Sequence, residues 1–196
     1  MASTYIPGTN PEKEKPHYTY KDYKTWREDV RCELWYGEPV MMSPAPRRRH
    51  QELLLDIALQ IKTYLTAKPC QVYVAPLDVF LVEDAESIED CELVVQPDLM
   101  VVCDTTKLID EGIRGAPDLI IEILSPTTAM RDQSEKKLLY ESKGVREYWV
   151  VNPDTLEVFR YVLEQDRYGL ARPAMLTDGA EATIFPGLKV VVTGER

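Results

Sequence analysis

The sequence predicts an α/β fold of the α+β kind, in which a central mixed sheet is flanked by helices. Two segments, 93–103 and 118–124, are apolar on both alternating faces and rich in β-branched residues, so each strand should be covered from both sides. A third segment, 48–67, has apolar residues at helical spacing instead. Strands that need cover on two faces, together with an amphipathic helix, indicate a sheet between helical layers.

Turn residues and breaks in the apolar pattern predict the elements of the first half of the chain. In order, they are a short helix at 18–29, a hairpin at 32–36 and 39–42, a long helix at 48–67, and strands at 71–75 and 77–82. Gly37-Glu38 supplies the hairpin turn, and Pro76 separates the last two strands. Along the long helix, apolar residues recur at i, i+3, i+4, i+7 and i+11 from Leu54, so one helix face should be buried.

The second half contains the two most apolar strands and a helix with clear ends. In order, the elements are strands at 93–103 and 118–124, a helix from Ser125 to about Lys143, and strands at 147–151, 156–162 and 188–192. Ser125-Pro126 places a hydroxyl residue ahead of a proline in the first turn, which is typical of a helix start. Gly144 is a helix stop.

The chain of 196 residues suits one domain, which we expect at 18–196. Residues 1–17 are expected to form a flexible leader, because three of the first sixteen residues are proline. Since no apolar run approaches the roughly 18 residues of a membrane helix, we expect a cytoplasmic protein.

The four cysteines stand at 32, 70, 91 and 103, and no two have the spacing of a zinc-binding pair. Both histidines are distant from any such pair. A structural zinc site is therefore not expected, and the cysteines in or beside strands are predicted to be reduced core residues.

The formal net charge is −10, which argues against a protein that coats nucleic acid without specificity. Six acids and no base stand in the loop 83–92, so without this loop the charge is −10 + 6 = −4. The loop is most simply a solvated turn. The net charge therefore does not exclude a nucleic-acid substrate, but any basic surface that binds it must be local.

Asp98 and Glu122 are carboxylates within the two most apolar strands. Alternation places Asp98 on the face of Met100 and Val102, and Glu122 on a face with Ile120 and Leu124. A carboxylate in such a run is costly unless it is paired or bound to a metal. A shared divalent cation suits two carboxylates on neighbouring strands. The structural alternative is a pair of buried salt bridges.

Lys136 is the natural cation for this site. It lies in the helix after the Glu122 strand, on one stripe with Asp132 and Tyr140. If it serves the site, its ammonium should lie within about 4 to 6 Å of one carboxylate. Lys137 should then point about 100° away, into solvent. The alternative is an ordinary exposed Asp132–Lys136 helix pair.

Further candidates are weaker. His50 shares the apolar stripe of the long helix, so its ring should point inward, either towards the site or as a histidine at the edge of the core. The triplet Arg47, Arg48 and Arg49 at the helix start could bind phosphate groups, although such triplets are often just solvated. Glu33 is a third carboxylate within a strand. Asp118 competes with Asp98, but is interpreted as a residue at a strand entry.

Several segments together resemble one family. They are Glu33-Leu34 with Gly37-Glu38, Ser43-Pro44-Ala45-Pro46 with His50, Gln96-Pro97-Asp98, Ala116-Pro117-Asp118-Leu119-Ile120-Ile121-Glu122-Ile123-Leu124-Ser125-Pro126, Asp132 with Lys136 and Tyr140, and Gly144-Val145-Arg146-Glu147-Tyr148-Trp149-Val150-Val151-Asn152-Pro153. Over roughly residues 18–192 the chain resembles the Uma family of putative restriction endonucleases, a branch of the PD-(D/E)XK nuclease superfamily.

The resemblance implies a restriction-endonuclease-like core and a metal-dependent endonuclease. Asp98 and Glu122 would hold Mg²⁺ or Mn²⁺, with a backbone carbonyl near Ile123 as a further ligand. Because Leu124 stands where the superfamily pattern has lysine, Lys136 from the next helix would take that role.

His50 and Glu33 would be auxiliary groups at the edge of this site. The implied reaction is hydrolysis of a phosphodiester bond in nucleic acid, with DNA the expected substrate. A homodimer is also expected, since many superfamily members pair to cut two strands. The alternatives are an inactive nuclease fold that binds nucleic acid or protein, and a phosphohydrolase acting on small esters.

Overall fold

The computed structural model describes residues 16–26, 30–42, 45–83, 86–125 and 134–193. Its larger sheet contains seven strands. They are β3 Gln71–Val74, β6 Leu99–Val102, β9 Leu119–Ile123, β10 Glu147–Val151, β11 Glu157–Glu164, β12 Arg167–Tyr168 and β13 Arg172–Met175. The order is β12-β11-β10-β9-β6-β3, with β13 paired to β11. The β9–β10 pair is parallel and the other pairs are antiparallel, so the sheet is mixed as predicted.

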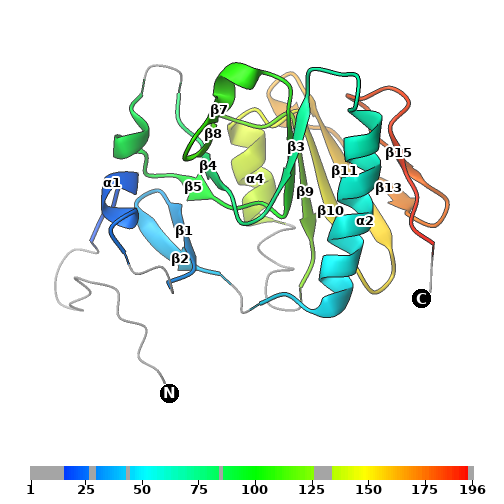
Figure 1. Ribbon diagram of the computed structural model, residues 1–196, viewed down its shortest axis with the longest axis horizontal. Helices are drawn as coiled ribbons and strands as arrows, with labels where there is room; N and C mark the ends of the chain where they lie inside the picture. The colour runs from blue at the N-terminus through cyan, green and yellow to red at the C-terminus, as the bar shows by residue number, and fades with distance from the viewer. Residues whose placement is uncertain (1–15, 27–29, 43–44, 84–85, 126–133, 194–196) are drawn as a thin grey trace.

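Helices cover this sheet on both faces, as the apolar strands require (Figure 1). Helix α2 (Arg48–Tyr64) packs its predicted stripe against Leu99, Val101 and the other side chains of one face. Helix α4 (Glu135–Ser142) packs Leu139 and Tyr140 on the opposite face with Met100 and Val102. The strands at the centre therefore lie in a core with two sides.

A second sheet of six strands lies beside the first (Figure 1). It contains β1 Cys32–Trp35, β2 Glu38–Met41, β4 Asp78–Phe80, β5 Val94–Val95, β7 Leu108–Ile109 and β8 Gly112–Arg114. Its order is β2-β1-β5-β4-β8-β7. The hairpin β1–β2 forms as predicted, although its turn is Tyr36-Gly37, where both residues have positive φ angles as a type I′ turn requires.

Two segments leave one sheet and enter the other. The chain passes from β3 to β4 at Ala75-Pro76, as the predicted break at Pro76 indicates. The expectation of one continuous strand at 93–103 is wrong, because the segment divides at Gln96-Pro97-Asp98 into β5 and β6. Since proline cannot donate to the ladder, Pro97 stands naturally at such a break. Asp98 therefore lies directly before a strand and not within it.

The remaining elements are short. They are α1 Tyr20–Tyr23, the 3-10 turns η1 Ile88–Asp90 and η2 Thr105–Lys107, and the hairpin of β14 Ala180–Glu181 with β15 Lys189–Val190. The predicted helix at 18–29 is thus shorter, with 27–29 outside the described residues. Most of the first half of the predicted helix at 125–143 also lies outside them. No helix in the described ranges is both long enough and apolar enough to cross a membrane.

The prediction that the cysteines are reduced core residues fails for one pair, since Cys70 and Cys103 form a disulfide. Strands β3 and β6 pair with Gln71 opposite Val102, so the next opposed positions are those of the two cysteines. The register between β3 and β6 thus brings together two cysteines that are 33 residues apart in the sequence. Cys32 is a buried thiol, as the sequence predicted, and Cys91 is a buried thiol as well; burial raises the pKa of each to about 11.

We expect two reactive thiols per chain when protein purified without reductant is titrated with a disulfide reagent in denaturant, and four after reduction. The folded protein should show almost none, because its two thiols are buried and stay protonated near neutral pH. Four thiols without reduction would contradict the disulfide.

Candidate active site

A cleft of about 450 Å³ opens where the two sheets meet. Its walls come from the β1–β2 hairpin, from the start of α2 and from both segments that change sheets. The lining residues include Arg31, Met42, Pro46, Leu54, Pro76 and Ile123 in addition to the polar groups described below. Mostly apolar walls around a polar floor are typical of a binding site.

Asp98 lies on the floor of this cleft and is held from two sides. Its Oδ2 accepts the backbone N–H of Ile123 at 2.8 Å and lies 3.1 Å from His50 Nε2. The ring of His50 thus points inward, as the helical stripe predicted. The Asp98 side chain keeps 22% exposure, whereas that of His50 keeps 9%. Asp98 is therefore fixed in position and still accessible from the cleft.

Glu122 stands within β9, only 3% exposed, on the predicted face with Ile120 and Leu124. Its Oε1 receives the Lys136 ammonium at 2.7 Å and the Tyr140 hydroxyl at 2.9 Å. Its Oε2 lies 3.4 Å from the backbone nitrogen of Asp98. The two carboxylates are therefore neighbours, as strands β6 and β9 are paired.

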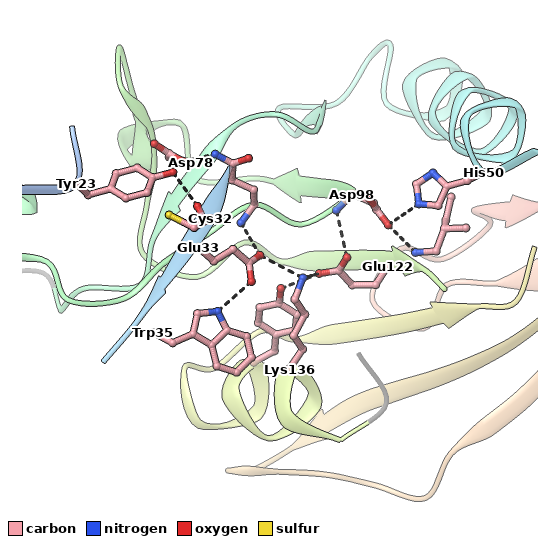
Figure 2. Close-up of polar contacts among 12 residues, drawn as sticks. Tyr23, Cys32, Glu33, Trp35, His50, Asp78, Asp98, Glu122 and Lys136 are labelled. Atoms are coloured by element: carbon pink, nitrogen blue, oxygen red, sulfur yellow. Dashed lines mark hydrogen bonds and ion pairs between the residues drawn. The ribbon is translucent and has the colours of Figure 1, made fainter. Parts of the chain in front are cut away.

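Lys136 reaches the site from helix α4 and not from strand β9, and it is buried (Figure 2). Besides Glu122, its nitrogen lies 3.2 Å from Glu33 Oε1. The expectation that the ammonium lies within about 4 to 6 Å of a carboxylate is confirmed, and both contacts are direct ion pairs. Lys137 points elsewhere, but it is half-buried with its nitrogen 4.6 Å from the centre of the Tyr161 ring, which corrects the expectation that it sees solvent.

Glu33 is bound by protein groups on both oxygens. Oε2 accepts from Trp35 Nε1 at 2.9 Å, and Oε1 accepts from the backbone N–H of Gln96 at 3.0 Å in addition to pairing with Lys136. Because these donors already surround the carboxylate, its simplest role is to fix the lysine between the two sheets.

The arginine triplet does not line this cleft. Arg48 pairs with Glu52 one turn along the helix, and Arg49 donates to the carbonyl of Pro153. Arg47 is exposed next to Pro46, at the rim. Arg31, which sequence reasoning overlooked, is the exposed arginine among the lining residues.

Two further carboxylates have structural surroundings. Asp118 accepts the Cys103 N–H and pairs with Arg146, which agrees with its interpretation as a strand-entry residue. Glu147 was not singled out from the sequence, yet it is fully buried. It accepts from Trp149 Nε1 and from the backbone nitrogens of Thr183 and Ile184. Glu33 and Glu147 share one sequence feature that could have identified them as buried carboxylates. Each is followed two residues later in its strand by a tryptophan, whose Nε1 donates to the carboxylate.

The donors on the floor fit a hard divalent cation. Among the described residues, no three His, Cys, Asp or Glu side chains converge as a complete cation cage. Two neighbouring carboxylates are nevertheless the typical protein contribution to a Mg²⁺ site, because Mg²⁺ keeps several waters and takes substrate phosphates as further ligands. Asp98, Glu122 and the nearby Ile123 backbone form such a partial set.

Asp78 lies behind the site and interacts with the same network (Figure 2). Its Oδ1 accepts from Gln96 Nε2 at 2.7 Å. Burial raises the pKa of this carboxyl above its usual 3.8; the hydrogen bond from Gln96 counteracts the rise, and the charge of Glu33 adds to it.

A model of the Uma2 family, described as putative restriction endonuclease, matches residues 20–193. The chain is also similar to a crystal structure of a putative nuclease belonging to DUF820 from Anabaena variabilis ATCC 29413, with a TM-score of 0.66. The two are 18% identical, and the match covers 86% of this chain and 90% of that chain. The likeness shows a common fold, which confirms the expected restriction-endonuclease-like core. No curated protein matches the chain.

Replacing Lys136 by Met should destabilise the protein by about 3 to 5 kcal/mol, because two buried carboxylates lose the ammonium between them. Lys137→Met is the matched control. It removes a partly exposed charge that lies over the Tyr161 ring, so it should lower the free energy of unfolding by about 1 kcal/mol or less. Urea unfolding at pH 7 measures both. Equal stabilities of the two variants would show that the buried ion pairs contribute little.

Asp78→Asn should gain stability relative to the wild type as pH rises from 4 to 7. With its pKa raised in the folded state, Asp78 favours folding while it is protonated, and this contribution is lost as pH rises through that pKa. Asn keeps the oxygen that accepts from Gln96 but cannot ionise. Urea unfolding at several pH values would show the trend, and a difference independent of pH would refute it.

Proposed function

The chain belongs to the Uma2 family of putative restriction endonucleases, and on this premise we propose that it is a metal-dependent endonuclease acting on phosphodiester bonds of DNA. The observation that carries the proposal is the floor of the cleft. There Asp98, directly before β6, lies next to Glu122 in the paired strand β9, and Lys136 pairs with Glu122.

In this proposal Asp98 and Glu122, which both line the cleft, hold Mg²⁺ or Mn²⁺. The cation, when bound, polarises the phosphate and lowers the pKa of a water molecule. His50 and the Ile123 N–H fix the orientation of Asp98 by binding its Oδ2. Because that oxygen is already occupied by two groups, Oδ1 is the more suitable one for a ligand.

Lys136 orients the attacking water and offsets the negative charge that develops on the phosphate. Its ammonium pairs with both Glu122 and Glu33 in this structure, which fixes it beside the floor of the cleft. Tyr140 steadies Glu122, and Glu33 holds the lysine in place. The apolar walls formed by Met42, Pro46 and Pro76 would limit access of bulk water.

The nucleic-acid backbone on either side of the reacting phosphate requires cations at the rim. Arg31 and Arg47 are exposed there, and we propose that both contact flanking phosphates. Arg48 and Arg49 are exposed as well, and each uses part of its guanidinium on the protein, so they would contribute more remote contacts. A local basic rim would serve a protein whose net charge is −10.

The second candidate is a binding module that has the fold but does not cut. The observation in its favour is that each acid has a basic neighbour, since Glu122 pairs with Lys136 and Asp98 lies against His50. Such a protein would bind nucleic acid or protein without needing a metal. Cleavage assays separate the two candidates.

We expect cleavage of plasmid or single-stranded DNA with Mg²⁺ or Mn²⁺ and none with EDTA. Asp98→Ala and Glu122→Ala should each reduce the rate by at least about 100-fold, because each removes a ligand for the cation. Asp118→Asn is the matched control, since this acid follows a proline in the same way as Asp98 but is bound to Cys103 N and Arg146; it should cut at the wild-type rate.

Circular dichroism must show that the alanine variants are folded. Full cleavage by Asp98→Ala, or undiminished cleavage in EDTA, would contradict the proposed role of the acids. DNA binding without cleavage under every metal condition would favour the binding module.

A further inference from the structure

The outer face of α2 carries two leucines that the described part of the chain leaves in solvent. Leu55 is 68% exposed and Leu59 is 64% exposed, whereas Leu54, Ile57 and Ile61 are buried against the sheet. Residues four apart lie on the same side of a helix in successive turns. The two leucines therefore form one apolar patch on the face opposite to the core.

This patch belongs to a longer pattern. Exposed residues recur along α2 and just past its end at alternating spacings of four and three, which is the repeat of a coiled-coil seam. The positions are Arg48, Glu52, Leu55, Leu59, Lys62 and Thr66. The seam is thus apolar at its middle, with Glu52 beside Arg48 on one side of the middle and Lys62 on the other.

A groove of about 200 Å³ lies beside Leu55. Its lining from α2 includes Glu52, Leu55 and Asp56, and Pro153, Leu156 and Val192 close it from the side. In a coiled coil, each leucine enters a hole formed by residues of the facing helix at this kind of spacing. The groove is therefore placed where a leucine from a second helix would enter.

We propose that this face is the contact between two copies of the chain, with the two α2 helices packed antiparallel about a twofold axis that crosses the exposed face at the level of residue 57. The symmetry then sets Leu55 against Leu59 of the partner subunit, and Glu52 against Lys62 of the partner subunit. The two numbers of each opposed pair sum to 114, so the symmetry forms the Glu52–Lys62 pair twice and the Leu55–Leu59 pair twice. The inference goes beyond the proposed nuclease function and does not depend on it.

The charges select this arrangement over the parallel one. In a parallel pair, Glu52 would face its own copy and so would Lys62, which places like charges together. In the single chain both side chains are exposed, with Glu52 paired to Arg48 and Lys62 3.4 Å from Gln71 Oε1. These surface contacts are weak enough to yield to a subunit contact. Other occupants, such as an unrelated helix, would have no reason to match the charge order.

The arrangement leaves both clefts accessible. His50 lies seven residues from the axis, so the two His50 positions would be separated by roughly 20 Å along the helix axes. Because one helix pair with its grooves is a small interface, we expect a dissociation constant on the order of micromolar.

The test is sedimentation of the full-length protein from about 1 to 500 μM, with charge exchanges at the seam. Glu52→Lys and Lys62→Glu should each weaken the dimer at least tenfold by opposing like charges. The double variant Glu52→Lys with Lys62→Glu should restore it to within about threefold of the wild type. The double exchange does not rebuild the Arg48–Glu52 pair, so recovery reports the contact between subunits.

Leu59→Ser should also weaken the dimer at least tenfold, whereas Leu170→Ser, which changes an exposed leucine in another part of the fold, should leave it intact. Thermal unfolding of each variant establishes that it is folded. A wild-type protein that stays monomeric at every concentration would overturn the proposal. So would a dimer that is indifferent to the charge exchanges, or one that Leu170→Ser weakens as much as Leu59→Ser does.

Discussion

One buried ammonium group connects the main parts of this fold. Lys136 projects from α4, pairs with Glu122 in the larger sheet and with Glu33 in the smaller one, and is itself almost inaccessible. Buried charges are tolerated when they are paired with good geometry and have further hydrogen bonds, as Trp35 provides to Glu33 and Tyr140 to Glu122. The helix and the two sheets must therefore keep fixed relative positions, and the cleft is a consequence of that requirement. The residues that we assign to catalysis are also those that hold the two sheets together.

The site lies where the chain changes sheets, at 75–76 and 96–98. The backbone at these points does not form a complete ladder. Ala75 N–H donates to the carbonyl of Asp98, and other backbone groups bind side chains. The N–H of Gln96 bonds to Glu33, and that of Asp98 approaches Glu122. Carboxylates of both sheets are thereby drawn to one place. A continuous strand through 93–103 would have placed Asp98 within the ladder and left no room for a cleft.

Much of this could be predicted from the sequence, for identifiable reasons. Periodicity reports which face of an element is buried, so the inward ring of His50 and the faces of Glu122 and Lys136 were predictable. Periodicity does not report which sheet a strand joins. The sequence therefore did not predict that segment 93–103 divides into β5 of one sheet and β6 of the other. Pairing of Cys70 with Cys103 depends on the register between β3 and β6, which no local pattern encodes. Glu147 was missed because its two backbone donors, Thr183 and Ile184, stand more than thirty positions later, although Trp149 donates from nearby.

The surroundings of Glu147 also bear on the order in which the chain can complete its structure during synthesis. Strand β10 leaves the ribosome well before Thr183 and Ile184, whose N–H groups bind the carboxylate. Until those residues emerge, a full negative charge beside Trp149 lacks two of its donors and resists being enclosed. The nascent sheet should therefore stay loose at this strand, next to β9 with Glu122, until residues 183–184 have left the ribosome.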